Sequence, residues 1–452
     1  MQPVATSADR SADELIRLIA SQALDPVSVT DQEERGLMKA FRAKEKRLLQ
    51  KLDDAIEGGA DRIARRASER LRRCMAARYL AIWRTKPSAL VDRTAASSHE
   101  RDAVRVERLR QVLSLLESAG DLTVQARATV YVKRKDRNRA YRCVNAPRPT
   151  LTSGGSADRR VIFKFDWIDR ARQRLIARSL HPFANYHPSQ FMLRGRGRSA
   201  VCEYLRQEVP TLSADHVFVQ VDVRNFFGSI SPSWIEGRFR LSEATIRRQM
   251  HSGEMLILMD GKARAYLQGG ENDERVRRVL PQGSALSPLI AEMAMAEVLR
   301  GLTDHLACAL VVTYSDNMGV FMPAAQAAAI EDHLRNAFGA SGVGPFELTF
   351  SKPRPVTGEF SFLGHLWRLD AGELRTFIHE SVAEARAIVL REQMLGCSTR
   401  KGLRNLRGRI LAQANEWKFW SGVHEWTSQL LDFWSGAYES LETHEHFDRL
   451  AA

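Results

Sequence analysis

The sequence contains few cysteines, and none of them is placed for a shared metal or a local disulfide. The five cysteines lie far apart along the chain, and none belongs to a Cys-x-x-Cys motif: they are Cys74, Cys143, Cys202, Cys308 and Cys397. This distribution argues against a zinc site and against a disulfide framework, so it favours a reducing compartment.

Long apolar runs are also missing. No run approaches the roughly 20 residues that a membrane-spanning helix needs, and the acidic residues Asp9, Asp13 and Glu14 do not fit a signal peptide. We therefore expect a cytoplasmic protein with no membrane partner. Internal repeats and long low-complexity tracts are absent as well, and the 452 residues are enough for two or three domains.

Acidic side chains are outnumbered by basic ones. The chain has 67 lysines and arginines against 54 aspartates and glutamates, which gives a formal net charge of +13. Such an excess favours a polyanionic partner, most often nucleic acid, although charge alone also fits a basic protein without one. Residues 61–73 are rich in arginine, and on a helix such residues either contact phosphates or form a solvated face.

Hydrophobic periodicity divides the chain into helical and mixed regions. Amphipathic helices are predicted before about residue 120, and the pattern is helical again from Glu380 to the end. Between these regions we predict a basic hairpin with strands at 129–132 and 141–145, a strand at 217–223, and a tight hairpin with strands at 309–313 and 319–322. In the strand at 217–223, alternation places Asp222 on the face opposite the valines.

Three short motifs in the middle of the chain carry the functional signal. They are Val-Asp-Val-Arg-Asn-Phe-Phe at residues 221–227, Pro-Gln-Gly-Ser-Ala-Leu-Ser-Pro at 281–288, and Tyr-Ser-Asp-Asn at 314–317. The first and third each place an aspartate, Asp222 and Asp316, at the end of an apolar strand. A single aspartate after a strand is usually a turn or cap residue. Two carboxylates from different strands, however, form the hard oxygen donor set that Mg²⁺ shares with nucleotide phosphates in two-metal phosphoryl transfer.

In this order, the three motifs resemble the palm of bacterial reverse transcriptases. The resemblance covers residues 122–370 well, the C-terminal region loosely and the N-terminal region hardly at all. It implies an α+β right-hand polymerase fold with a helical N-terminal extension. The regions implied are the N-terminal extension at 1–120, fingers at 121–215, a palm with an antiparallel sheet at 216–370 that includes finger elements around 235–280, and a helical thumb at 371–452.

The resemblance also implies roles for single residues. The catalytic residues would be Asp222, Asp316, Asn317 and Lys352, and the metal ligands would be Asp222, Val223 and Asp316. The implied cofactor is a pair of Mg²⁺ ions, with Mn²⁺ as an alternative. Phe227 would be the steric gate that rejects a ribose 2′-hydroxyl, although core packing is the simpler role for an aromatic side chain. Lys352 would protonate the departing pyrophosphate, although a surface lysine needs no such role.

Two further groups of residues would hold the substrates. The implied nucleotide-binding residues are Lys133, Lys135, Arg142, Phe227, Gln282 and Gly283. The implied primer- and template-binding residues are Tyr314, Leu363, Gly364, Arg400, Lys401, Arg404 and Arg407. Four tryptophans follow the last of these, and we expect at least three of them to be helix-packing core rather than base platforms.

Two positions depart from the family pattern. Asn317 stands where the family has a second aspartate, and Glu292 stands where it usually has an asparagine. An amide oxygen coordinates Mg²⁺ without contributing charge. We expect an active site that tolerates Asn317; the alternative is a weakly active or inactive RNA-binding protein that keeps a polymerase fold.

The subgroup that the chain resembles most is the defence-associated, formerly unknown-group, reverse transcriptases, with retron reverse transcriptases as the second choice. This implies an RNA-directed DNA polymerase that uses dNTPs, copies a dedicated noncoding RNA, makes a DNA product and acts against phage. A homo-oligomer through the N-terminal helices is also expected. Template-independent or protein-primed DNA synthesis on the same palm stays open, whereas a bulky Phe227 argues against an RNA polymerase.

Overall fold

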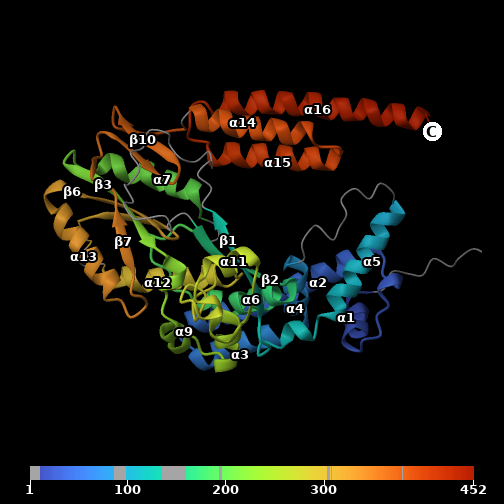
Figure 1. Ribbon diagram of the computed structural model, residues 1–452. Helices are drawn as coiled ribbons and strands as arrows, with labels where there is room; N and C mark the ends of the chain where they lie inside the picture. The colour runs from blue at the N-terminus through green and yellow to red at the C-terminus, as the bar shows by residue number, and fades with distance from the viewer. Residues whose placement is uncertain are drawn as a thin grey trace, which may run out of the picture. The chain divides into compact units, whose positions relative to one another are not determined.

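The computed structural model describes residues 11–85, 98–134, 159–192, 196–302, 306, 308–378 and 380–451. These residues form helices and three sheets (Figure 1). They belong to two compact units, each built from segments distant in sequence. The first unit takes in Met1–Lys133, Arg160–Asn185 and Ile230–Met293, and the second takes in Tyr186–Ser229 and Ala294–Ala452.

The N-terminal part of the first unit is helical, as the sequence pattern predicts. Its helices are α1 (Ala12–Ala20), α2 (Asp31–Glu57), α3 (Asp61–Arg73), α4 (Met75–Thr85) and α5 (Ser98–Ser114). A capping box starts the long helix α2, because the Thr30 hydroxyl accepts from the Glu33 N–H and the Glu33 carboxylate accepts from the Thr30 N–H. Leu37, Phe41 and Leu52 recur at helical spacing on its buried side.

A small sheet in the first unit has the strand order β2-β1-β4. Its strands are β1 (Arg127–Arg134), β2 (Arg159–Phe165) and β4 (Leu256–Met259), and β1 runs parallel to β4. Ala128, Phe163 and Ile257 bury one face of this sheet. The predicted strand at 129–132 is therefore present within β1, whereas the returning strand predicted at 141–145 lies outside the described residues.

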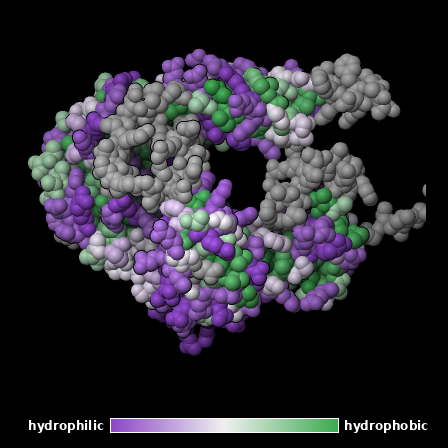
Figure 2. Space-filling view, viewed as in Figure 1, coloured by the Kyte–Doolittle hydropathy of each residue, from purple (hydrophilic) through white to green (hydrophobic). Residues whose placement is uncertain are grey.

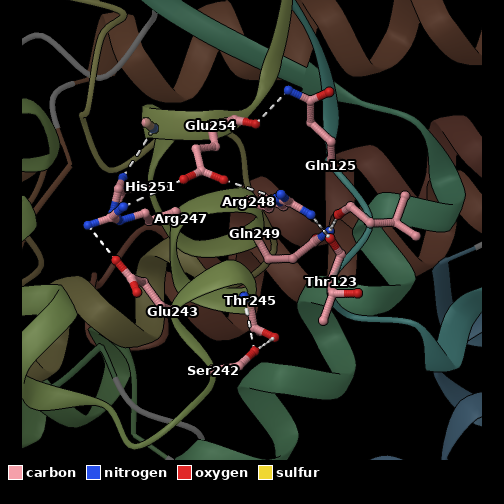
Figure 3. A network of polar contacts seen from close by, with 12 residues as sticks. Thr123, Gln125, Ser242, Glu243, Thr245, Arg247, Arg248, Gln249, His251 and Glu254 are labelled. Carbon is pink, nitrogen blue, oxygen red and sulfur yellow. Dashed lines mark hydrogen bonds and ion pairs between the residues drawn. The ribbon is translucent and has the colours of Figure 1, made fainter.

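A polar network joins the segment before β4 to the residues that lead into β1 (Figure 3). This segment includes α9 (Pro232–Arg238), α10 (Glu243–Thr245) and one turn of π-helix at Ile246–Met250. The Arg248 guanidinium donates to the Thr123 carbonyl at 2.8 Å and to the Glu254 carboxylate at 3.0 Å. The Gln249 amide donates to the Val124 carbonyl at 2.7 Å.

Two other helices lie next to the Pro-Gln-Gly motif: one contacts the loop through Gln173, and the other begins at Ser287. They are α6 (Trp167–Leu180) and α12 (Ser287–Arg300). In the part of the chain that the structure describes, no helix combines the length and apolar composition needed to cross a bilayer.

The second unit contains a larger antiparallel sheet with the strand order β5-β6-β3-β7, and β8 also pairs with β3. The strands are β3 (His216–Arg224), β5 (Leu310–Tyr314), β6 (Asn317–Pro323), β7 (Glu347–Phe350) and β8 (Arg354–Pro355). Phe218, Phe321, Phe360 and Trp367 pack in the core of this unit beside helix α7 (Arg198–Glu208). Both predicted elements, the strand at 217–223 and the tight hairpin around residue 315, are present.

A second sheet, helix α13 (Ala327–Gly339) and three C-terminal helices also belong to this unit. The sheet order is β11-β10-β9, with β9 (Glu359–Phe362), β10 (His365–Asp370) and β11 (Glu373–Phe377), and the helices are α14 (Glu380–Leu395), α15 (Arg400–Glu416) and α16 (Val423–Ala451). The C-terminal helices begin at Glu380, as the pattern predicts. Residues 371–379, placed at the start of a helical thumb, instead include strand β11.

The C-terminal helices are held together by aromatic side chains. Trp417 and Trp426 are buried, and Trp420 and Trp434 are partly buried against the same core. The indole N–H groups of Trp426 and Trp434 donate to backbone carbonyls at 2.9 Å and 2.7 Å, so their polar atoms are satisfied inside the bundle. The prediction that these tryptophans are mainly packing residues is confirmed.

Candidate active site

A row of four residues crosses the larger sheet of the second unit. Tyr314 lies opposite Asn317, Asn317 opposite Asp222, and Asp222 opposite Thr349. Directly opposed residues of an antiparallel sheet project their side chains to the same face. Asp222 is exposed while the valines on either side of it are buried, so this face of the sheet is open at Asp222.

The hairpin between β5 and β6 brings Asp316 to the same place. Its loop consists of Ser315 and Asp316, and only Ser315 has a positive φ, at 58°. The Val223 N–H donates to the Asp316 carbonyl at 3.0 Å, so the backbone of Asp316 lies next to that of Asp222. The Asn317 amide donates to the Asp316 carboxylate at 3.2 Å. Because Asn317 shares a face with Asp222, this hydrogen bond places both carboxylates on that face.

The outer edge of the hairpin is braced by a segment that sequence reasoning missed. The Thr313 N–H donates to the Ser189 carbonyl at 2.8 Å, and the Phe191 N–H donates to the Thr313 carbonyl at 3.0 Å. These bonds continue the sheet beyond β5 by one short stretch of extended chain. Nothing in the local pattern of residues 189–191 signals a strand, because the pairing is made with residues more than a hundred positions away.

The two phenylalanines after β3 have different environments. Phe226 is buried and packs against Phe346 with ring centroids 5.5 Å apart. Phe227 is only partly buried and meets Phe226 edge to face at 6.0 Å. Asn225, between the strand and these rings, has a positive φ of 46°, which turns the chain sharply into the short helix α8 (Phe226–Ser229). Phe226 is therefore the core residue of the pair, and Phe227 keeps an accessible surface.

Lys352 is exposed on the connection between β7 and β8, both of which pair with β3. The neighbouring Ser351 holds this connection to the strand, since its N–H donates to the Gln220 carbonyl at 2.8 Å and its hydroxyl accepts from the Gln220 N–H at 2.9 Å. Lys352 is thus fixed alongside the same strand that carries Asp222.

The loop of the Pro-Gln-Gly motif belongs to the first unit. The Gln282 carbonyl accepts from the Phe163 N–H at 2.9 Å, and Gly283 has φ +121°. A Cβ on Gly283 would lie 2.2 Å from the Phe163 carbonyl oxygen, so only glycine fits here. The fully buried Gln173 of α6 accepts from the Ala285 N–H at 3.1 Å. The loop conformation is therefore set by contacts within the protein.

The predicted triphosphate ligands are only partly described. Lys133 is exposed near the end of β1. Lys135 and Arg142 lie outside the described residues.

The hairpin between β9 and β10 contains the predicted primer contact. Its two-residue loop is formed by Leu363 and Gly364, with φ values of 51° and 82°, the pattern of a type I′ turn. Leucine is unusual at positive φ, and it packs partly buried against the core. His365 follows the turn, and burial lowers the pKa of its imidazole, which keeps it neutral.

The predicted thumb arginines lie against aromatic rings of α16. Arg400 is 5.9 Å from the Tyr438 ring centroid, Arg407 is 5.6 Å from that of Trp434, and Arg404 donates to the Tyr438 hydroxyl at 3.1 Å. Arg404 and Arg407 remain exposed in these contacts. Lys401 is part of helix α15, and its side chain is outside the described set.

A link from the hairpin to the C-terminal helices was not predicted. Arg198, the first residue of α7, donates to the Glu416 carboxylate at 2.8 Å, and its guanidinium lies 5.7 Å from the Tyr314 ring centroid. Glu416 is the last residue of α15. The Gly-Arg-Ser stretch at 197–199 was the available signal, but its partners come from distant segments.

The donor set on the open face suits a divalent cation that keeps water and phosphate ligands. It offers two carboxylates, Asp222 and Asp316, with the Asn317 amide beside them. Among the described residues, no cluster of three or more His, Cys, Asp or Glu side chains could enclose a metal. A closed structural site is therefore absent from this part of the chain, and the open carboxylate pair fits a Mg²⁺ ion shared with a substrate.

Residues 152–366 match the family model for reverse transcriptase (RNA-dependent DNA polymerase). The chain contains a reverse transcriptase domain. This domain is that of a nucleotidyltransferase, and its fold is the right-hand polymerase fold of the α+β class that the sequence predicts. The matched stretch of the reverse transcriptase domain includes Asp222, the Pro-Gln-Gly loop, Asp316 and Lys352.

Two solved polymerase structures are similar to the chain at low identity. Telomerase from Candida albicans, in complex with a fragment of telomeric RNA, is 9% identical with a TM-score of 0.36, covering 74% of this chain and 64% of that one. The RNA-dependent RNA polymerase of bacteriophage phi12 is 10% identical with a TM-score of 0.36, covering 75% of this chain and 59% of that one. The chain thus spans less than two thirds of the length of each of these two polymerases. No curated protein sequence matches the chain.

Proposed function

We propose that the chain is an RNA-directed DNA polymerase that joins dNTPs to a primer hydroxyl by phosphoryl transfer. The observation that carries the proposal is the shared open face of Asp222, Asp316 and Asn317 within a reverse transcriptase domain. In this reaction the primer hydroxyl attacks the α-phosphate of the nucleotide, and pyrophosphate leaves. Asp222 and Asp316 would hold Mg²⁺, with Mn²⁺ as a substitute. When bound, the two ions acidify the attacking hydroxyl and neutralise charge on the leaving group.

The remaining site residues would bind and orient the substrates. Phe227, partly exposed five positions after Asp222, would exclude a ribose 2′-hydroxyl by contact. Lys352 would give a proton to the leaving pyrophosphate, since this residue lies on the connection between β7 and β8, which both pair with β3. The Val223 carbonyl would add a neutral metal ligand.

Further residues would hold the rest of the substrates. Gln282 and Gly283 would face the nascent base pair, and Lys133, Lys135 and Arg142 the triphosphate. Tyr314, Leu363 and Gly364 would contact the primer, and Arg400, Lys401, Arg404 and Arg407 the duplex backbone.

The test is dNTP incorporation on an RNA template with a DNA primer, using the full chain and Mg²⁺. The variants Asp222→Asn and Asp316→Asn remove one charge each with almost no change of shape. Each should lower the rate by about a thousandfold or more, because each replaces a charged metal ligand by a neutral amide and so weakens charge stabilisation in the transition state by several kcal/mol. The control is Asp332→Asn, an exposed aspartate on α13 (Ala327–Gly339). Undiminished synthesis by either site variant would refute the assignment.

We further propose that the template is a dedicated noncoding RNA and that the DNA product acts in defence against phage in the cytoplasm. The support is the resemblance of the motif set and the helical N-terminal region to that class; the wide spacing of the cysteines, none of them in a Cys-x-x-Cys motif, favours a reducing compartment. Sequencing the nucleic acid that copurifies with the full chain tests the first part. Phage plaque counts with the wild type and Asp222→Asn test the second. Copurification of random cellular RNA would contradict the first part. Equal plaque counts for the wild type and Asp222→Asn would contradict the second.

The neutral Asn317 favours a second candidate, an RNA-binding protein that keeps the polymerase fold without catalysis. Under this alternative, Asp222→Asn and Asp316→Asn would leave both RNA binding and cellular function intact, and no dNTP would be incorporated. Template-independent or protein-primed synthesis is a separate variant of the lead proposal. It is distinguished by sequencing products made with and without added RNA.

A further inference from the structure

Exposed cations without a protein partner are concentrated on helices α2 and α3. Within the described residues, these side chains make no hydrogen bond, ion pair or ring contact. They are Lys39, Arg42, Lys44, Lys46, Arg47 and Lys51 on α2, and Arg62, Arg66 and Arg70 on α3. We call this set the α2–α3 basic surface.

The acidic residues within the basic stretch of α2 and on α3 are paired with other residues, whereas Asp53, Asp54 and Glu57 follow at the end of α2. Glu45 is the only acid between Lys39 and Lys51; it is 4% exposed and is held inside by Arg84 at 2.9 Å and 2.7 Å. The other arginines of α2 and α3 with exposed acid neighbours form i,i+4 ion pairs. These are Arg35 with Asp31, Arg65 with Asp61, and Arg73 with Glu69. Among the described residues, no carboxylate therefore forms an ion pair with a member of the basic surface.

The three arginines of α3 form a row along the helix. Successive members are four residues apart, so each is displaced by about 6 Å along the axis and about 40° around it. Ala64 and Leu71, which lie on the opposite side of the helix, are buried. Figure 2 shows hydrophilic residues over the lower edge of the view, where α3 lies in Figure 1.

We propose that the α2–α3 basic surface binds the sugar–phosphate backbone of double-stranded RNA. Guanidinium groups in a row suit successive phosphates, because each presents a planar set of donors and stays charged. An RNA helix is recognised mainly through its backbone and shape, which calls for charge rather than for base-reading side chains. None of these residues belongs to the proposed active site. The choice of RNA rests on the proposed function, whereas the choice of a phosphate backbone rests on the charges.

The same surface is poorly suited to the other partners considered. A helix that lies in a lipid interface exposes a broad apolar face. On α3, the exposed large apolar side chain is that of Ile63, at 60%. The other apolar side of this helix, at Ala64 and Leu71, is buried. Self-association through these helices would bring like charges together, so this face disfavours the expected homo-oligomer.

The test compares two triple variants of the full chain that remove the same charge. The first is Arg62→Gln/Arg66→Gln/Arg70→Gln, and the matched control is Arg35→Gln/Arg65→Gln/Arg73→Gln, whose arginines are ion-paired. Binding of a blunt RNA hairpin is measured by fluorescence anisotropy over a range of salt concentrations. Loss of three phosphate contacts should reduce the slope of log affinity against log salt by about three and weaken binding by about tenfold or more near 0.1 M salt. The control should reproduce the wild type more closely.

Three outcomes would overturn the proposal. Equal losses for the two triple variants would show that binding follows net charge alone. Unchanged duplex affinity in the first variant would show that these arginines do not contact the backbone. Arginine-dependent binding to phosphatidylserine–phosphatidylcholine vesicles, with no effect on duplex RNA, would assign the surface to a membrane.

Primer extension on a short unstructured template separates this inference from the proposed function. The first variant should keep wild-type extension there, because its substitutions lie outside the proposed active site. If the wild type incorporates no dNTP but the arginines still bind duplex RNA, the proposed function fails and this inference stands. If extension is normal and the two triple variants bind alike, the inference fails and the proposed function stands.

Discussion

Asn317 lies directly opposite Asp222 in the ladder between β6 and β3, and its amide donates to the Asp316 carboxylate at 3.2 Å. One neutral side chain thus stands between the two acids that form the proposed metal site. An aspartate here would place three carboxylates within one corner of the sheet, and it would have no N–H to donate. Asparagine instead orients Asp316 and adds no charge.

The first prediction is that Asn317→Asp makes stability strongly dependent on divalent cations. Without metal, the variant should be about 1–2 kcal/mol less stable than the wild type, because it loses a hydrogen-bond donor and gains like-charge repulsion. Adding Mg²⁺ should restore more stability to the variant than to the wild type. Urea unfolding with EDTA and with Mg²⁺ measures both effects. Asn336→Asp, on the exposed side of α13, should show no such Mg²⁺ dependence; equal responses of the two variants would contradict the prediction.

The second prediction concerns Gly283. Its replacement by alanine should cost about 3 kcal/mol or more, since the new methyl group meets a backbone oxygen at 2.2 Å and the φ of +121° disfavours a side chain. Gly36→Ala is the matched control, because no atom lies within 4 Å of a Cβ built at this helical position. The control should gain up to about 1 kcal/mol. Chemical unfolding measures the free energy of unfolding of both variants. An unchanged free energy for Gly283→Ala would show that the loop can shift to make room for the methyl group.

The active-site corner could be anticipated from sequence because its signals are local. Alternation in the strand at 217–223 exposes Asp222, and two apolar runs separated by a short polar stretch require the tight hairpin that carries Asp316. The local sequence also predicts that one of the adjacent rings of Phe226 and Phe227 faces the core, and the structure shows that it is Phe226.

The features that could not be anticipated depend on pairing between distant segments. Thr349 joins the row with Asp222 only because β7 pairs with β3, and Ser189 extends the sheet only because the chain returns beside β5. The resemblance implies that Gly283 binds the nucleotide, and the structure supplies a separate reason for glycine within the protein, the Phe163 carbonyl. Sequence spacing contains no information about such partners.

The third prediction is that Arg198 and Glu416 are energetically coupled. The ion pair is about a third exposed on each side, so a double-mutant cycle with Arg198→Gln and Glu416→Gln should give a coupling of about 0.5–1 kcal/mol. The more exposed pair Arg224 and Glu347 should give less. Because Arg198 also lies over the Tyr314 ring, both single variants should shorten the average primer-extension product. Additive effects on stability would show that the contact contributes nothing.

The fourth prediction is a loss of stability in acid that depends on His251. This imidazole is 1% exposed, and its Nε2 lies 3.1 Å from the Glu236 carboxylate while its Nδ1 accepts from the Gly253 N–H at 3.1 Å. Nε2 therefore carries the proton of a neutral ring. Burial lowers the pKa of His251, and nearby Arg278 and Arg247 lower it further, which outweighs the opposing effect of Glu236.

The sign of the effect follows from which state takes up the proton. As the pH falls through the ordinary histidine range, the unfolded chain binds a proton at position 251 and the folded chain does not, so folding stability decreases until the lowered pKa is passed. Urea midpoints between pH 8 and pH 5 should therefore fall less steeply for His251→Gln than for the wild type. His424→Gln, an exposed residue of α16, should follow the wild-type curve. Some slope should remain in His251→Gln, because burial also lowers the pKa of His187 and His365. Parallel curves for the wild type and His251→Gln would show that the buried ring takes up its proton equally well in the folded state.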